Sequence, residues 1–258
     1  MQELQDEFGS KGLVVLAVSD ESEEKVSAYV DEMGVRVRCA AGFSSGDKWG
    51  VSGYPSAVLI NAQGEISWTG HPSSLSSSKV KAALKGAKPR KGGFMSFRVK
   101  RELSSKLKSA AAAALDGKLG KAHAKASKIG ADERPDASER EDAQVFAGEI
   151  LDFAKQLRAQ AESAIKNRRM LEGLKVLEAL EGEFKRTEFG GELTRRLAEI
   201  ADDQDLQNEL AAAQAWAKAM AAVEKRGLKK AAKKFEGIVK KYPGTRAAER
   251  ATLKLRGI

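Results

Sequence analysis

The sequence predicts a small α/β domain followed by an all-α domain built from helical hairpins. Short apolar runs bounded by glycine, which are typical of strands, occur within residues 1–86. Beyond residue 95, apolar residues recur at the 3.6-residue spacing of helices, and only Pro135 and Pro243 interrupt the pattern. Residues 87–95 are rich in glycine, proline and positive charge, so we interpret them as a linker and 96–258 as the helical domain.

The distribution of charge supports this division. The net charge is −6 over residues 1–78, +13 over 79–130 and +2 over 131–258. An acidic first part, a basic middle and a balanced last part indicate more than one domain.

The first domain is expected to follow the order α-β-α-β-α-β-β-α. The apolar run Gly12–Ser19 is typical of a buried strand of a parallel sheet. An acidic helical turn follows it, and Asn61–Gly64 reads as a hairpin turn. The remaining elements are expected as a helix at 1–8, a helix ending near Met33, a strand at 35–40, a short helix at 45–49, strands at 55–60 and 65–69, and a helix at 77–84.

Several of these segments carry a resemblance to a known family. The loop Gly50–Pro55, the strand Val58–Asn61 and the hairpin partner Gly64–Trp68 resemble the C-terminal half of thioredoxin-like proteins. The redoxin, or TlpA-like, disulfide-reductase branch is the most similar. Gly12–Asp20 resembles a strand of that group, and Gly70–Pro72 a motif near its end.

The resemblance implies a substrate-binding loop at Gly53, Tyr54 and Pro55. In that family the proline is cis, and the backbone of the residue before it pairs with an extended substrate. The resemblance therefore implies a cis Tyr54–Pro55 bond and a thiol–disulfide oxidoreductase lineage. It also implies an extracytoplasmic location, although no signal peptide is recognisable at the start of this chain.

One departure from the family concerns catalysis. Met1–Phe8 matches the later part of the helix that begins with Cys-x-x-Cys in the family, so neither catalytic cysteine has a counterpart here. We expect a chain that begins downstream of that motif and lacks the central strand before it. Either Gly12–Ser19 pairs directly with Pro55–Ile60, or the gap between them stays open. The resemblance thus predicts a member of the thioredoxin-like oxidoreductase family that is inactive in this chain. The alternative is a non-catalytic interaction scaffold that uses its helical repeats.

Cys39 is the single cysteine and a candidate redox thiol, because Arg36 and Arg38 lie beside it. The alternative is a small, partly buried core residue. His71 and His123 are widely spaced, so we expect a structural role for His71, no metal site and no cofactor.

The helical domain contains an internal repeat. Segments beginning with Gly117, Gly173 and Gly227 align at separations of 55 and 54 residues when matched on Leu119, Leu174 and Leu228. Each copy is expected as a helix, a turn at the glycine and a second helix, with stacked copies sharing a core. The last copy resembles a tetratricopeptide-type repeat, which implies a protein or peptide partner. Helical stripes are expected from 146 to 165, 171 to 184, 206 to 223, 228 to 242 and 247 to 255, the first begun by a capping box at Ser138.

The basic segment from Lys79 to Lys128 raises a nucleic-acid alternative. It has only Phe94 and Phe97 as aromatic residues and no recognition motif, so nucleic acid is not expected as a partner of this chain. A solvated helix face, or docking on the acidic part of the chain, explains the charge equally well. No apolar run reaches the length of a membrane span.

Overall fold

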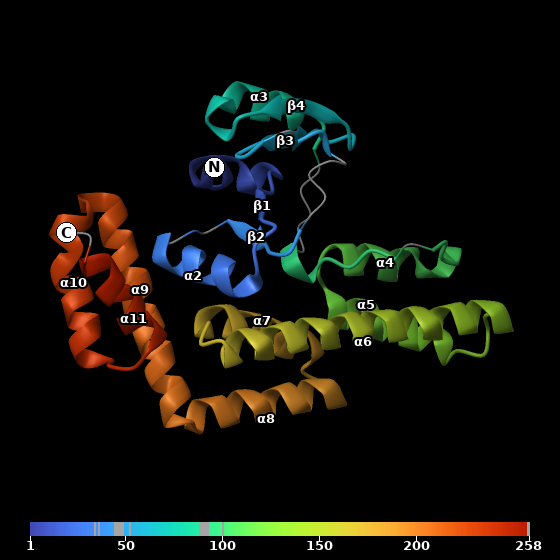
Figure 1. Cartoon of the computed structure of the whole chain (residues 1–258). Helices are drawn as coiled ribbons and strands as arrows, with labels where there is room; N and C mark the ends of the chain where they lie inside the picture. Colours follow the sequence, from blue (N-terminus) through green and yellow to red (C-terminus); the bar gives the residue numbers. More distant parts are fainter. Residues whose placement is uncertain are drawn as a thin grey trace. The chain divides into compact units, whose positions relative to one another are not determined.

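In the computed structural model the chain forms two compact units, Met1–Arg90 and Lys91–Ile258 (Figure 1). The structure describes residues 1–33, 35, 37–43, 49–51, 53–87, 93–99 and 101–256. The division falls inside the segment that the sequence identifies as a linker. Most of the short helix expected at 45–49 lies outside the described residues.

The first unit contains α1 (Gln2–Phe8), β1 (Leu16–Val18), α2 (Glu23–Met33), β2 (Arg38–Ala40), β3 (Ala57–Ile60), β4 (Ile66–Gly70) and α3 (Ser77–Ala83). β1 pairs with β2 in parallel, and β3 pairs with β4 in an antiparallel hairpin. Within the described residues these are two separate two-stranded sheets, and β1 is not paired with β3. Of the two arrangements considered from the sequence, the structure shows the open gap.

The core of this unit is small and centres on α1 and α3. Phe8 and Val80 are fully buried, and Leu59 of β3 is nearly so. The Gln5 side chain ties α1 to the chain before β1: its Nε2 donates to Leu13 O (3.2 Å), and its Oε1 accepts from Val15 N (2.7 Å). The Gln5 amide thus satisfies backbone groups of Leu13 and Val15, just before β1, that a neighbouring strand would otherwise bind.

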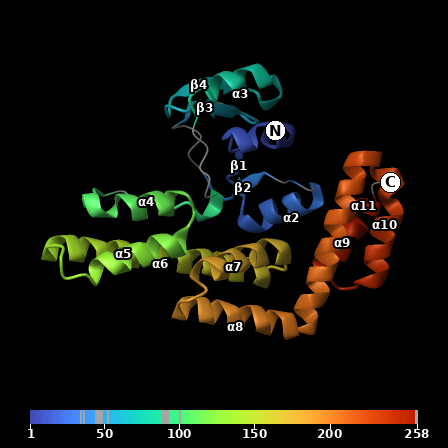
Figure 2. The same cartoon turned by 180° about the vertical axis from the view of Figure 1, so that it is seen from behind.

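The second unit is entirely helical in its described part, as the sequence predicts. It contains α4 (Lys108–Leu115), α5 (Leu119–Gly130), α6 (Ala137–Lys166), α7 (Met170–Phe184), α8 (Glu188–Asp202), α9 (Gln204–Arg226), α10 (Leu228–Lys241) and α11 (Arg246–Leu255). Two clusters of buried side chains hold it together, one among α4–α8 and one among α9–α11. Figures 1 and 2 show the arrangement of these two groups of helices.

The expected apolar stripes are largely correct, with three corrections. α6 begins two residues earlier than predicted, because Asp136 rather than Ser138 caps it by accepting from Glu139 N at 2.8 Å. Leu171 is 42% exposed, outside the core. In α9 the buried face holds Ala212, Trp216 and Ala219 instead of the predicted Ala213 and Ala217. The Trp216 ring lies 5.3 Å from the Phe235 ring, so this aromatic contact sets the face that α9 turns inward.

The repeat is also only partly regular. Gly117 and Gly227 have φ values of 76° and 79° and form the turns before α5 and α10, as predicted. Gly173 instead lies inside α7, and the turn before α7 uses Arg168 at φ 60°. The reason is packing: a Cβ on Gly173 would lie 2.7 Å from Ala161 O, so glycine is needed there for the close approach of α6 and α7.

Arg168 joins the two helical clusters. Its Nε donates to Glu209 of α9 at 2.6 Å, and its Nη1 donates to Glu249 of α11 at 3.0 Å. Its Nη2 donates to the carbonyl oxygen of Gly244, in the turn between α10 and α11. Charge-assisted hydrogen bonds therefore fasten the α6–α7 turn to the helices α9–α11.

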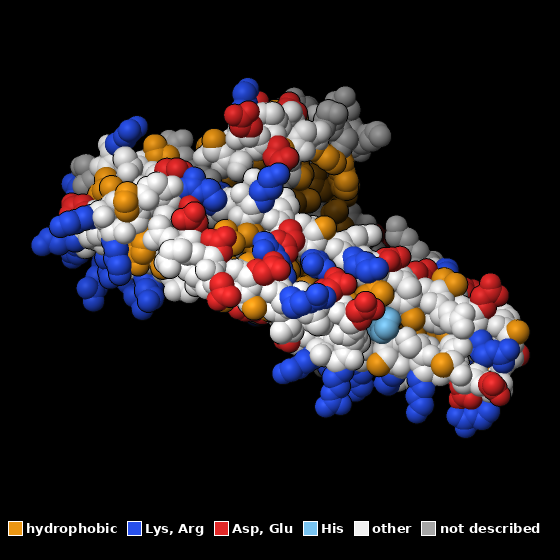
Figure 3. Space-filling view, turned by 90° about the horizontal axis from the view of Figure 1, so that it is seen from below, with side chains coloured by type: hydrophobic (Ala, Val, Ile, Leu, Met, Phe, Trp, Pro, Cys, Tyr) orange, Lys and Arg blue, Asp and Glu red, His pale blue; other side chains and the backbone are white. Residues whose placement is uncertain are grey.

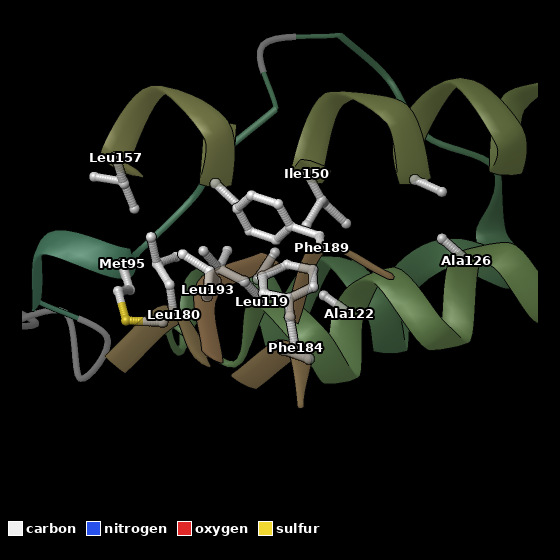
Figure 4. Close-up of a cluster of buried hydrophobic side chains, with 14 of the residues drawn as sticks. Met95, Leu119, Ala122, Ala126, Ile150, Leu157, Leu180, Phe184, Phe189 and Leu193 are labelled. Atoms are coloured by element: carbon white, nitrogen blue, oxygen red, sulfur yellow. The ribbon is translucent and has the colours of Figure 1, made fainter. Parts of the chain in front are cut away.

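Buried side chains from several helices meet at the C-terminal end of α7 (Figure 4). Phe184 lies in the core, and the ring of Phe189 meets it edge-on at 5.3 Å. Gly120 N donates to Glu183 Oε2 at 3.1 Å, which caps α5 from a different helix. Cβ atoms on Gly120 and Gly190 would lie 1.8 Å from Glu183 O and 2.0 Å from Phe184 O. Glycine at these two positions lets α5 and α8 touch the backbone of α7.

We expect Gly120→Ala to lower the free energy of unfolding by about 1–3 kcal/mol, because the added methyl group overpacks against the Glu183 carbonyl. Gly182→Ala in α7 is the matched control. Nothing lies within 4 Å of an added Cβ there, so alanine should raise stability by about 0.5–1 kcal/mol. Urea denaturation followed by circular dichroism measures both, and a stabilised Gly120→Ala variant would contradict the close contact.

Candidate functional site

The loop that the sequence identifies for substrate binding is exposed. The Tyr54–Pro55 peptide bond is cis, as the resemblance implies. Tyr54 is 75% exposed, and nothing lies within 4 Å of a Cβ built on Gly53. Ser56 Oγ donates to Gly53 O at 2.5 Å and closes the loop on itself. The loop thus presents an aromatic side chain to solvent just before β3, and its role in binding stays a prediction.

β1 differs from its prediction. The run Gly12–Ser19 is expected to be buried, yet Leu16 and Val18 are 56% and 49% exposed, and Val14 before them is 66% exposed. Strands of parallel sheets are normally covered on both faces. Ala17 between Leu16 and Val18 is exposed as well, so among the described residues no element covers either face of β1.

The backbone of β1 is half satisfied by β2. Ser19 N donates to Ala40 O at 2.9 Å, and Ala17 pairs with Cys39 in register. Because backbone groups of successive residues point to opposite edges of a strand, those of Leu16 and Val18 point away from β2. Among the described residues nothing pairs with these backbone groups, and the side chains of Leu16 and Val18 are exposed on one face beside this edge. We call Val14–Val18 on this side the open edge.

The surroundings of the open edge are acidic where β1 ends. Asp20, Glu21, Glu23 and Glu24 follow the strand, and all are exposed. Lys25 pairs with Glu21 at 2.8 Å, which leaves an excess of negative charge at this end. Because the charges are exposed, the attraction between them and a cation is modest and screened by salt.

Cys39 lies in β2 and is exposed. Its Sγ donates to Val37 O at 3.6 Å, a bond that favours the protonated form. Partial burial raises the pKa of the Cys39 thiol above its usual value. Arg36, which the sequence suggested as an activating neighbour, lies outside the described residues. The exposure of Cys39 does not fit the alternative of a core residue, and the redox thiol stays a prediction.

The histidines have structural environments. His71 Nδ1 accepts from Ser73 N at 3.3 Å and lies 2.7 Å from Ser73 Oγ, so this ring caps the short 3₁₀ turn Pro72–Ser74. His123 is half-buried in α5 against the edge of Phe184, and burial lowers its pKa. Within the described residues, no three histidine, cysteine or carboxylate side chains gather closely enough to hold a metal ion.

The structure also forms a pocket that the sequence does not reveal. It has a volume of about 500 Å³ and lies between α3 and the β3–β4 hairpin. Lys79 Nζ sits 4.9 Å from the centre of the Trp68 ring, and Lys85 and Gln63 also line the pocket. A sequence pattern could not have identified it, because the lining residues come from elements that meet only after folding.

Comparisons with known proteins add no assignment: no family model, curated protein or solved structure matches the chain. Among the helices of the described residues, none has the length and apolar composition needed to cross a bilayer.

The raised pKa of Cys39 gives a test of its chemistry. We expect the rate of alkylation by iodoacetamide to stay low at neutral pH and to rise only at a pH above that of the same chain unfolded in urea, because the thiolate is the reactive form. The pH profile of the rate, followed by mass spectrometry, measures this directly. A midpoint below that of the unfolded chain would show an activated thiol and support the redox prediction for Cys39.

Proposed function

We propose that this chain is a non-catalytic protein-interaction module that takes an extended segment of a partner protein onto the open edge of β1. The observation that carries the proposal is the combination of unpaired backbone groups and exposed Leu16 and Val18 on the same strand. In strand addition, main-chain hydrogen bonds supply affinity and alternate side chains supply specificity.

The chemistry of the partner follows from what it must cover. An added strand gains hydrogen bonds from Leu16 and Val18 and buries their side chains together with Val14. The partner segment is therefore extended and apolar at alternate positions. A cationic residue at the end that meets Asp20 and Glu21 complements the negative charge there.

The lineage of the first unit is a separate part of the proposal. We infer that it derives from thioredoxin-like thiol–disulfide oxidoreductases of the redoxin branch. The order of elements and the Gly53–Tyr54–Pro55 loop before β3 support this inference. Partial desolvation raises the pKa of the Cys39 thiol, which supports a chain that does not use this thiol in catalysis. The helical unit supplies a rigid second body, in keeping with the scaffold alternative.

Hydrogen exchange tests the open edge in the free protein and in the presence of a probe. We expect the amides of Leu16 and Val18 to exchange faster than those of Ala17 and Ser19 in the free chain, because only the latter two face β2. Addition of the peptide Lys-Val-Thr-Val-Thr-Val should slow exchange at Leu16 and Val18. Protection of these two amides before the peptide is added, or no protection after it, would contradict the proposal.

A proline substitution separates the two edges of β1. Val18→Pro removes an N–H from the open edge without removing a hydrogen bond to β2, so it should weaken peptide binding at least tenfold while β1 and β2 stay paired. Ile66→Thr is the control, because Ile66 is 54% exposed but lies on β4. Fluorescence anisotropy with the labelled peptide measures both. Equal loss in the two variants would indicate nonspecific apolar binding.

A further inference from the structure

The end of α9 and helix α10 carry a dense group of positive charges. Over residues 225–241, eight lysine and arginine residues stand against the single acid Glu236, a net charge of +7. All eight side chains are exposed. Figure 3 shows Lys and Arg side chains gathered at the end of the helical unit where α9–α11 lie. We call these residues the basic face: Lys225, Arg226, Lys229, Lys230, Lys233, Lys234, Lys240 and Lys241.

The opposite face of α10 is already occupied. Ala231, Phe235 and Ile238 are at most 3% exposed and pack against α9 and α11. At 3.6 residues per turn, the six lysines of α10 span about 140° of the helix circumference, on the side away from these three. At 1.5 Å per residue, the lysines from Lys229 to Lys241 extend over about 18 Å along α10, and Lys225 and Arg226 lie at the end of α9, before the turn at Gly227. It is therefore a convex, rigid ridge of positive charge on a packed helix.

The protein does little to neutralise this charge. Among the described residues, no ion pair involves a member of the basic face, whereas Arg158, Arg168 and Arg196 elsewhere in the unit all pair with glutamates. Lys241 Nζ lies 5.2 Å from the centre of the Tyr242 ring. Lys229 and Lys233, like Lys230 and Lys234, stand one turn apart, and like charges at this spacing destabilise a helix. An anionic partner would remove this repulsion.

We propose that the basic face binds the phosphate backbone of duplex nucleic acid without regard to sequence. The major groove of B-form DNA is about 12 Å wide and admits a helix, with phosphates on both walls. A ridge with cations over about 140° of its circumference meets both walls at once. Lysine contacts phosphate as a point charge, without the paired geometry that arginine uses to read guanine. The contacts therefore position the helix on the backbone and carry no base specificity.

A membrane fits these observations less well. A basic helix that binds a bilayer inserts its apolar face among the lipid chains. The apolar face of α10 is committed to Phe235 and its neighbours within the protein. This surface is separate from the Lys79–Lys128 segment, for which the sequence offered a solvated face as a sufficient explanation.

The test is binding of the full chain to a fluorescein-labelled 20-base-pair DNA duplex of arbitrary sequence, followed by anisotropy at several salt concentrations. If six of the eight cations contact phosphates, log K should fall against log salt with a slope of about −5. A second duplex of scrambled sequence should bind within about twofold of the first. A slope near zero, or strong preference for one duplex, would overturn the proposal.

Charge-matched variants locate the surface. The quadruple variant Lys229→Gln, Lys230→Gln, Lys233→Gln and Lys234→Gln should weaken binding at least 30-fold at low salt and make the salt slope shallower by about 3–4. The control replaces four exposed lysines on or beside α4 and α5 with glutamine: Lys108, Lys118, Lys121 and Lys128. It removes the same net charge and should change binding less than threefold.

Two further outcomes decide against the basic face. Equal losses in the two quadruple variants would show that only the total charge of the chain matters. Binding to phosphatidylserine vesicles without binding to the duplex would assign the surface to a membrane. Glutamine has nearly the helix propensity of lysine, so both variants should retain the circular dichroism spectrum of the parent chain.

Discussion

The backbone contact at the C-terminal end of α7 is the constraint on which the larger helical cluster depends. α5 and α8 both reach the last turn of α7, and the two glycines at the contacts leave no room for a side chain. Phe184 fills the centre of the cluster, and Glu183 caps α5 from outside its own helix. Helices this close have little freedom to rotate, so the core side chains keep one arrangement.

Polar contacts, in contrast, join helices α9–α11 to this larger cluster. Arg168 takes a left-handed backbone conformation, and its guanidinium group reaches Glu209, Glu249 and a turn carbonyl. A planar guanidinium with several donors can satisfy three acceptors together, which lysine cannot do with the same geometry. Helices α9–α11 share their own aromatic core, and Arg246 Nη1 also fastens them to the α6–α7 turn by donating to Asn167 O at 3.1 Å. The outer side of α10 carries the basic face.

In the described part of the α/β unit, more of the large apolar side chains are exposed than buried in the core. Its core holds few large side chains, while apolar residues of β1, β3 and β4 remain in contact with water. An unpaired strand edge beside exposed apolar surface favours association with another extended chain. The proposed functions thus use two chemically different surfaces, an apolar strand edge on one unit and a basic helix on the other.

The sequence by itself determined the division into a small α/β part and a helical part, the helical stripes of α6, α7 and α10, and the turns at Gly117 and Gly227. These features follow from local spacing and from the backbone freedom of glycine, which neighbours in the chain control. The tertiary structure alone decided that β1 is exposed, that Arg168 and not Gly173 forms a turn, and that Trp216 selects the buried face of α9. It also decided where the open edge and the pocket beside Trp68 lie. Burial and strand pairing depend on contacts with residues that are distant in sequence, and a local sequence pattern does not predict those contacts.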